Sequence, residues 1–383
     1  MCPQSLPLAG ILVVDLTRAV AGPFCTMNLG DFGARILKIE EPVNGDETRH
    51  WGPPFIQSES TYWLGINRNK ESVTLDLKSP GGLATLHRIL AKADVVIENF
   101  RPGVTHRLGI DYASLNRPDL IYVSISGFGQ TGPDRHKAGY DMMIQAMSGL
   151  MTVSAYPDGP PVKCGFPVAD VITSLYAGQA IAAALFARTR DGQGRYIELC
   201  LLEGLLAAMC SVTSSWLLAH KEPEPMGAMQ ANIAPYGIFQ CSDGKMVVGA
   251  LNQRLWEGLC RALGTTHLLD DPQFRDNSQR VANREILAPL VEAVLTTQTR
   301  AHWMQILEKE QVPCGPVWSI GEVLESPLIR DRQAIIAPEH PTLGKLKMFR
   351  NPTRIANTQL RRDPPPLLGE HTEAVLKEFA PEL

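Results

Sequence analysis

Short apolar runs alternate with helical patterns over the first 200 residues, and this alternation limits the possible folds more than any other feature. The apolar runs have the length and β-branched content of buried strands: residues 11–16, 35–40, 72–77, 94–100 and 120–126. Helical patterns separate them, as at 80–93, where leucine and isoleucine side chains recur on one face. Because strands that alternate with helices form parallel sheets, the sequence predicts an α/β fold with a Rossmann-like parallel sheet.

The predicted sheet also indicates where a ligand would bind. In open parallel sheets, ligands occupy the crevice beyond the carboxyl ends of the strands. The residues that follow the predicted strands there are Ala21, Glu41, Asn99 and Gly127. We therefore expect the chemistry to gather around these four positions.

The second half of the chain predicts a smaller unit. A short strand at 195–199 and an apolar helix at 201–218 precede a Pro-rich linker at 221–227. Two strands joined by an Asp-Gly turn and several helical patterns follow: residues 236–241, 245–249, 253–263, 284–295 and 300–310. The tail has no core of its own. The sequence thus predicts a large domain at 1–200, completed by 325–383, and a small α+β domain at 201–324.

Charge, cysteine spacing and hydropathy exclude several classes of protein. The formal net charge is −4, and no dense basic run is present, so neither nucleic acid nor an anionic membrane is an expected partner. The cysteines form no CxxC pair, and no His cluster has metal-ligand spacing. No signal peptide is evident, and no apolar run approaches the ~20 residues that span a bilayer. We expect a cytoplasmic protein without a bound metal.

Residues 127–132 fit the G-x-G-x-x-G pattern of dinucleotide sites. Pro133 and Asp134 follow where the helix of such a site should begin, and the run follows a late strand rather than the first. The pattern is weak evidence outside a strand–turn–helix context. An NAD-type oxidoreductase remains an alternative.

Asp170 stands where a Pro-rich loop becomes a long helix rich in small apolar residues, up to Ala187. Asp is among the best N-cap residues, so Asp170 could satisfy the unpaired amides of the first turn. A carboxylate at this position could also be a nucleophile. The residues of this stretch alone leave both interpretations open.

Several stretches, in matching order and spacing, carry a resemblance over nearly the whole chain: residues 15–24, 33–40, 67–78, 98–103, 126–133, 138–141, 168–170 and 365–371. The chain resembles the class III coenzyme A transferases, a family that includes formyl-CoA transferase and carnitine CoA-transferase. Residues 27–31, 51–55 and 233–237 are most similar to the succinyl-CoA:glutarate branch, which accepts small dicarboxylates.

The resemblance implies a role for particular residues. Asp170 matches the nucleophile of the family. The positions that match its coenzyme A contacts are Val20, Ala21, Leu75, Asp76, Leu77, Lys78, Asn99, Phe100, Arg101, Arg107, Ala138, Gly139, Tyr140 and Asp141. The chain departs from formyl-CoA transferase-like members at Val20, where they often have Gln, and at Glu41, where they often have Arg.

The resemblance further implies an interlocked homodimer, acyl-CoA as a substrate and no tightly bound cofactor. The implied reaction moves CoA from an acyl-CoA donor, expected to be succinyl-CoA, to a dicarboxylic acid through an aspartyl-CoA thioester on Asp170. A carboxylate can form both the anhydride and the thioester that this transfer requires. A CoA-binding protein without catalytic activity is an alternative that would keep the phosphate contacts and need no nucleophile.

A 2-methylacyl-CoA racemase of the same superfamily is another alternative. Racemisation needs two acid/base groups around one carbon. Racemases have His where this chain has Tyr140. Because a phenol has an ordinary pKa near ~10, it is a poor base at neutral pH, and Tyr140 favours transfer.

Overall fold

The computed structural model describes residues 5–382, which divide into two compact units. Unit 1 contains the residues up to 150, then 163–219, and those from 331 onward. Unit 2 contains residues 151–162 and 220–330. The sequence predicted a large domain of residues 1–200 and 325–383, whereas by contacts residues 201–219 group with unit 1, and residues 151–162 and 325–330 group with unit 2.

Unit 1 is built on a six-stranded sheet in which all neighbouring strands are parallel. Its order is β5-β2-β1-β6-β7-β8, with these bounds: β1 (Leu12–Asp15), β2 (Arg35–Glu40), β5 (Lys70–Thr74), β6 (Val95–Glu98), β7 (Ile121–Ser126) and β8 (Arg195–Cys200). In chain order this is the 3-2-1-4-5-6 arrangement of Rossmann sheets. The predicted α/β class and parallel sheet are confirmed, and the strand order reverses between β1 and β6.

Alternate residues of the strands enter separate cores on the two faces of the sheet. Val13, Ile36 and Val95 belong to one core, and their neighbours Val14 and Leu37 belong to the other. Burial on both faces explains why these strands are continuous apolar runs rather than alternating ones.

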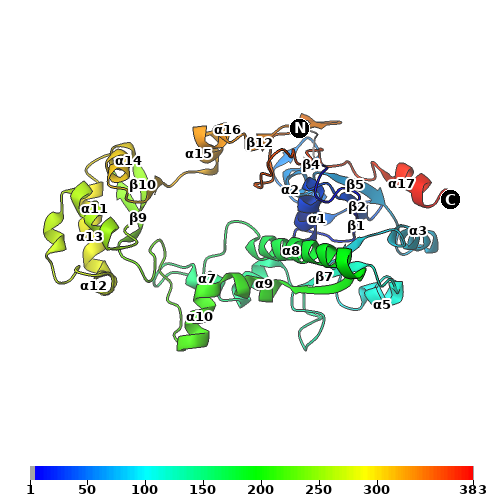
Figure 1. Ribbon diagram of the computed structural model, residues 1–383, viewed down its shortest axis with the longest axis horizontal. Helices are drawn as coiled ribbons and strands as arrows, with labels where there is room; N and C mark the ends of the chain where they lie inside the picture. The colour runs from blue at the N-terminus through cyan, green and yellow to red at the C-terminus, as the bar shows by residue number, and fades with distance from the viewer. Residues whose placement is uncertain (1–4, 383) are drawn as a thin grey trace. The chain divides into compact units, whose positions relative to one another are not determined.

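Helices cover both faces of the sheet (Figure 1). Those of unit 1 are α1 (Ala21–Asp31), η1 (Glu47–His50), α2 (Thr61–Ile66), α3 (Pro80–Leu90), α4 (Val104–Arg107), α5 (Tyr112–Leu115), α6 (Asp141–Met147), α8 (Val168–Asp191), α9 (Leu201–Ala208), α10 (Cys210–Ala219) and α17 (Thr372–Phe379). The helix α7 (Leu150–Val153) lies at the boundary with unit 2. Short paired strands complete unit 1: β3 (Phe55–Ile56) with β4 (Glu59–Ser60), β12 (Ile335–Ile336) with β15 (Met348–Phe349), and β13 (Glu339–His340) with β14 (Gly344–Lys345).

The long helix α8 packs in the core beside α1 and α9. Its small residues permit this close packing: Ala169, Ala177 and Ala184 are buried. The prediction that no apolar run is long enough to span a membrane is wrong for α8 by length and composition alone, since it has 24 residues that are mostly apolar. Its charged residues are confined to its two ends: Asp170 in the first turn, and Arg188, Arg190 and Asp191 in the last.

The helix predicted at 201–218 is two helices. Met209 separates α9 from α10, and their axes differ by 83°. Leucine and alanine, which are good helix formers, precede Met209, whereas the weaker helix formers Cys210, Ser211, Val212 and Thr213 follow it. No glycine or proline marks the break. In α9, Leu201 and Leu205 enter the core, whereas α10 buries no residue in this chain.

Unit 2 contains a three-stranded antiparallel sheet covered by helices. Its strands are β9 (Tyr236–Cys241), β10 (Gly244–Gly249) and β11 (Cys314–Pro316), and the predicted hairpin is present. Its helices are α11 (Gln253–Leu263), η2 (Thr266–Leu269), α12 (Asn277–Ala282), α13 (Arg284–Leu295), α14 (Arg300–Lys309), α15 (Ile320–Glu325) and α16 (Pro327–Asp331). The unit has its own core around Phe239, Trp256 and Leu307.

Candidate active site

A cavity of about 1200 Å³ opens in unit 1 where the strand order reverses. Its lining includes residues from the loops that follow three strands: 18–21 after β1, 99–102 after β6, and 127 after β7. Ala21, Glu41, Asn99 and Gly127 all line it, as the parallel sheet predicts.

Most of the residues named from the resemblance line this cavity: Val20, Ala21, Lys78, Asn99, Phe100, Arg101, Ala138, Gly139, Tyr140, Asp141 and Asp170. Leu75, Asp76, Leu77 and Arg107 do not. Leu75 and Leu77 instead contribute to the core on one face of the sheet. Asp76 accepts a hydrogen bond from the backbone of Lys78, so it shapes the turn that carries that lysine.

The glycine run after β7 serves close packing of backbone. A Cβ placed on Gly127 would lie 2.5 Å from the Cα of Gly139. Only glycine at both positions allows these two segments to touch. The contact brings Tyr140 and Asp141, at the start of α6, to the cavity wall beside β7. Close packing thus accounts for Gly127 and Gly139 without a dinucleotide.

Asp170 is the third residue of α8 and does not cap it. Pro167 occupies the N-cap position and offers no side-chain acceptor. The first-turn amides are capped instead by Asp141 of α6, whose Oδ1 accepts from the backbone N of Ala169 at 2.8 Å and of Asp170 at 3.4 Å. The N-cap interpretation of Asp170 is therefore wrong, because α8 begins two residues earlier than the loop composition suggested.

The Asp170 carboxylate faces the cavity without a partner. Among residues 5–382, no hydrogen bond or ion pair reaches either of its oxygens. Burial raises the pKa of Asp170, and the nearby charge of Asp141 raises it further, to about 7. A shifted carboxylate in a cavity is typical of catalytic groups.

Two aromatic side chains that are not among the site residues predicted from the sequence line the same cavity as this carboxylate. Tyr62 and Trp51 line the cavity, and their rings pack edge to face with centroids 5.2 Å apart. Burial, with the charges of Asp170 and Asp141, raises the pKa of Tyr62 to about 12. Residues 51–55 are among the stretches that carry the resemblance, so the sequence offered a signal that Trp51 could belong to the site.

A set of buried charges holds the loop that follows β1. We call it the ionic network and define it by Asp15, Lys38, Glu40, Asp46, Arg49 and Lys70. Lys70 pairs with Asp15 at 3.1 Å, Lys38 with Asp46 at 3.0 Å, and Arg49 with Glu40 at 2.8 Å.

The ionic network reaches the cavity through backbone contacts. Lys38 donates to the carbonyl of Thr17 at 2.8 Å, and the amide of Ala19 donates to Asp46 at 3.3 Å. Ala19 has a φ of +62°, a conformation that a residue with a side chain rarely adopts. The ionic network therefore fixes the path of residues 17–21 along the cavity wall.

Two of the basic side chains that the resemblance predicts to contact coenzyme A are available to a ligand. Lys78 and Arg101 line the cavity, are exposed, and form no ion pair with a described residue. Asn99 is engaged elsewhere: its amide accepts from the backbone N of Arg18 at 2.9 Å and donates to the Arg18 carbonyl at 2.8 Å. Asn99 thus ties the loops after β1 and β6 together.

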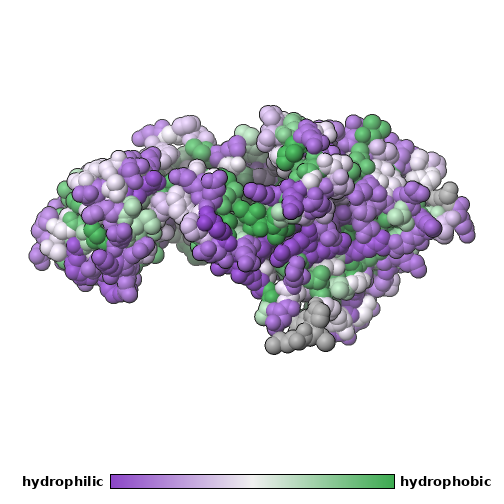
Figure 2. All heavy atoms as spheres, turned by 90° about the horizontal axis from the view of Figure 1, so that it is seen from above, coloured by the Kyte–Doolittle hydropathy of each residue, from purple (hydrophilic) through white to green (hydrophobic). Residues whose placement is uncertain are grey.

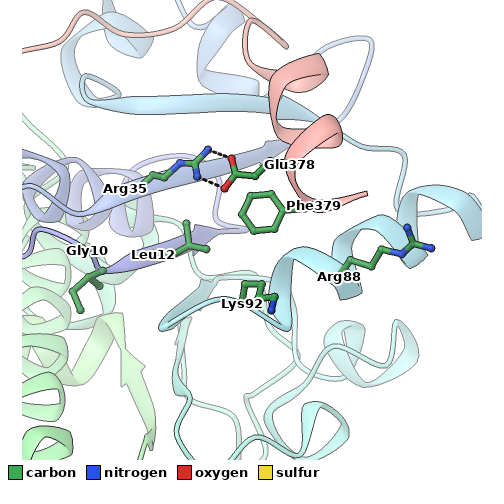
Figure 3. A pocket seen from close by; sticks show the side chains of 8 residues that line it. Gly10, Leu12, Arg35, Arg88, Lys92, Glu378 and Phe379 are labelled. Carbon is green, nitrogen blue, oxygen red and sulfur yellow. Dashed lines mark hydrogen bonds and ion pairs between the residues drawn. The ribbon is translucent and has the colours of Figure 1, made fainter. Parts of the chain in front are cut away.

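A separate cavity of about 460 Å³ lies at the opposite ends of β1 and β2. Figure 3 shows Arg35 paired with Glu378 there, beside Phe379 of α17. Glu71 also pairs with Arg35, so the positive charge of Arg35 is compensated within the chain. Among the described residues that line this cavity, the one carboxylate is that of Glu378, and it is paired with Arg35, unlike Asp170.

Across the described residues 5–382, no cluster of three or more His, Cys, Asp or Glu side chains could hold a metal ion.

Comparison with known proteins gives consistent matches. The sequence pattern that defines CoA-transferase family III matches residues 8–372. The chain is 40% identical over 380 residues to a mouse succinyl-CoA:glutarate CoA-transferase, covering 98% of this chain and 87% of that protein. It is 39% identical over 379 residues to an acetyl-CoA:oxalate CoA-transferase of Acetobacter aceti, covering 98% and 96%. A crystal structure of a CAIB/BAIF family protein from Brucella suis superposes with a TM-score of 0.88 at 38% identity, covering 98% and 100%.

Proposed function

The chain belongs to CoA-transferase family III, and from this premise we propose that it moves coenzyme A from an acyl-CoA donor to a small carboxylic acid. The relatives named for succinyl-CoA, glutarate and oxalate favour succinyl-CoA as donor and a dicarboxylate as acceptor. The observation that carries the proposal is the unpartnered Asp170 carboxylate in a cavity large enough for an acyl-CoA.

In the first half of the reaction, an Asp170 oxygen attacks the carbonyl carbon of the acyl-CoA. The C–S bond breaks, CoA leaves as the thiolate, and Asp170 carries a mixed anhydride. The thiolate then attacks the Asp170 carbonyl carbon. The donor acid leaves with the bridging oxygen, and an aspartyl-CoA thioester remains.

In the second half, the acceptor carboxylate attacks the thioester carbonyl and expels the CoA thiolate again. The thiolate attacks the acceptor carbonyl of the new anhydride, which frees Asp170 and yields the product acyl-CoA. No proton is transferred and no oxidant is required. The ionised form of Asp170 is the reactive one, so a pKa near neutrality leaves a large fraction of it ready at pH 7 to 8.

The side chains around Asp170 have distinct roles in this scheme. Lys78 and Arg101 are placed to meet the phosphates of coenzyme A, since they line the cavity and form no ion pair with any of residues 5–382. Trp51 and Tyr62 limit the access of water on their side of the site, and exclusion of water protects an anhydride from hydrolysis.

Trapping of the covalent intermediate tests the proposal. The protein is incubated with succinyl-CoA without acceptor, digested, and analysed by mass spectrometry. A CoA adduct should appear on the peptide that contains Asp170, hydroxylamine should release it, and added glutarate should discharge it as glutaryl-CoA. Asp170→Asn should form no adduct, whereas the control Asp191→Asn, at the far end of α8, should form it normally. Adduct formation on Asp170→Asn would refute the assignment.

The racemase alternative predicts a different product. Incubation with a 2-methylacyl-CoA in deuterated water should give no α-deuterium, because Tyr140 stands where racemases have their histidine base. Rapid exchange would contradict transfer as the main activity.

The proposal includes a homodimer and a cytoplasmic location, as the resemblance and the sequence composition imply. Apolar side chains remain exposed in the single chain, as Figure 2 illustrates for one face. On α10, Leu217 and Leu218 are 70% and 84% exposed, and Phe186 of α8 is 64% exposed. Exposed apolar surface of this kind supports association between subunits. Sedimentation velocity at micromolar concentration should give a dimer, and a monomer would count against this part of the proposal.

A further inference from the structure

The start of α8 depends on a residue from another helix. The first amides of a helix have no intrahelical acceptor, and Pro167 supplies none through its side chain. Asp141 precedes Asp170 by 29 residues and accepts from both Ala169 and Asp170 through one oxygen, Oδ1. The backbone that carries the proposed nucleophile is thus held by α6.

The second oxygen of Asp141 connects to the loop before α8. Its Oδ2 accepts from Nε2 of Gln145 at 2.6 Å, one turn along α6. Gln145 is 1% exposed, and its Oε1 accepts from the backbone N of Cys164 at 2.8 Å. Asp141 and Gln145 therefore fix both the loop at 163–167 and the first turn of α8.

The charge on Asp141 has no cation beside it. Among the described residues it forms no ion pair, and its partners are two backbone amides and one side-chain amide. The ionisable groups that face Asp170 are Asp141 from α6 and Tyr62 from α2. From α1, the carbonyl of Ala21 accepts from Ser174 of α8 at 2.5 Å and carries no charge.

We propose that Asp141 is a positioning residue for the transfer reaction. From α6 it caps the first turn of α8, and it places an uncompensated negative charge beside the Asp170 carboxylate. This inference rests on the proposed nucleophilic role of Asp170. The cap fixes the direction of attack, and the charge makes the ionised nucleophile more basic, in agreement with the raised pKa of Asp170. Asp141 was named from the resemblance as a coenzyme A contact, and its hydrogen bonds indicate this second role.

Two substitutions separate the cap from the charge. Asp141→Asn keeps the oxygen that caps α8, and Asn caps helices about as well as Asp, but the charge and the acceptor for Nε2 of Gln145 are lost. Asp141→Ala removes both. The readout is the rate of CoA-adduct formation on Asp170 in a single turnover, measured from pH 5 to 9 together with KM for the acyl-CoA.

For the wild-type protein, adduct formation should rise with pH and level off above an inflection near 7, because ionised Asp170 is the attacking form. Asp141→Asn should shift this inflection to lower pH by about one unit, since the neighbouring charge is gone. Asp141→Ala should show the same shift and also lose about 10- to 100-fold in the limiting rate, with KM changed less than about 3-fold. Asp134→Asn, in the exposed loop before α6, is the matched control and should leave the inflection in place.

The outcomes distinguish this inference from the proposed function. Absence of an adduct in the wild-type protein would refute the nucleophile itself. If the wild-type adduct forms and both Asp141 variants keep the wild-type inflection, the charge role is wrong. If Asp141→Ala also keeps the wild-type limiting rate, the capping role is wrong as well. Circular dichroism of both variants verifies folding, and the near-isosteric Asn variant keeps the pH test valid if the Ala variant fails to fold.

Discussion

Unit 1 contains two sets of buried or half-buried carboxylates that the fold treats in opposite ways. In the ionic network, Asp15 is fully buried, yet Lys38, Lys70 and nearby hydroxyls outweigh the effect of burial and hold its pKa well below the usual range. At the start of α8, Asp170 and Asp141 lie together without an ion pair to any described residue, and burial together with the charge of Asp141 raises the pKa of Asp170 to about 7.

This difference in charge pairing indicates which carboxylates stabilise the fold and which are available for catalysis. A buried charge that serves stability is paired, because an unpaired one costs several kcal/mol. A nucleophile needs free lone pairs, so its charge must stay uncompensated at the expense of stability. The ionic network also fixes the loop at 17–21, which lines the same cavity as Asp170. The paired charges therefore help to hold the shape of the cavity in which the unpaired carboxylate lies.

The largest expected effect is the loss of catalysis in Asp170→Asn. We expect the transfer rate from succinyl-CoA to glutarate to fall by at least about 10⁴-fold, because an amide oxygen cannot form the anhydride. The free energy of unfolding should not decrease by more than about 1 kcal/mol, since the Asp170 side chain has no bond to lose. Steady-state kinetics and urea unfolding measure the two quantities. A wild-type rate would refute the mechanism.

The reverse pattern is expected in the ionic network. Lys70→Met removes the cation of the Lys70–Asp15 ion pair and leaves Asp15 buried, so the free energy of unfolding should fall by about 3 to 5 kcal/mol. Urea unfolding at pH 7 measures it. The control is Arg195→Met, which breaks the exposed pair with Asp191 and should cost less than about 1 kcal/mol. A loss below 1 kcal/mol for Lys70→Met would mean that the ionic network does not compensate its charges.

The two sets should also give opposite dependences of stability on pH. Because the pKa of Asp170 is raised in the folded state, ionisation of Asp170 lowers stability as the pH rises from about 4 to about 7. Asp170→Asn should therefore equal the wild type near pH 4 and exceed it by about 1 to 2 kcal/mol at pH 8, a value reduced for partial solvent screening. Urea unfolding at both pH values tests this. A difference that does not change between pH 4 and 8 would show that Asp170 titrates normally.

The ionic network predicts loss of stability in acid. The pKa values of Asp15, Glu40 and Asp46 are all lowered by their cations, which outweigh burial. Their contribution is complete above about pH 5 and declines as the pH falls below 4, in both the wild type and Asp170→Asn.

The smallest expected effect concerns cations that the fold leaves free. Lys78→Met should weaken binding of CoA about 10-fold, change kcat less than about 3-fold, and lose its effect at high salt. Arg107→Met is the matched control from the same resemblance, because Arg107 does not line the cavity and should change binding less than about 2-fold. Isothermal titration with CoA at two salt concentrations measures both. Equal losses in the two variants would show that the cavity does not define the coenzyme site.

The sequence by itself determined the elements and the chemistry they carry. Apolar runs and helical periodicity are local, so the strands of the parallel sheet and the long helix that bears Asp170 could be placed from neighbouring residues alone. The ends of helices were less well determined: α8 begins at Val168 rather than Asp170, and the helix predicted at 201–218 breaks at Met209. Tertiary packing decides such boundaries.

Only the tertiary structure decided which charges meet. Lys70 and Asp15 lie 55 residues apart, and Asp141 and Asp170 lie 29 apart, so no local pattern reveals that the first pair is compensated and the second is not. The same applies to Tyr62, which reaches the cavity from α2. Propensity and periodicity act over a few residues, whereas the pKa of a carboxylate depends on every charge and dipole that folding brings near it.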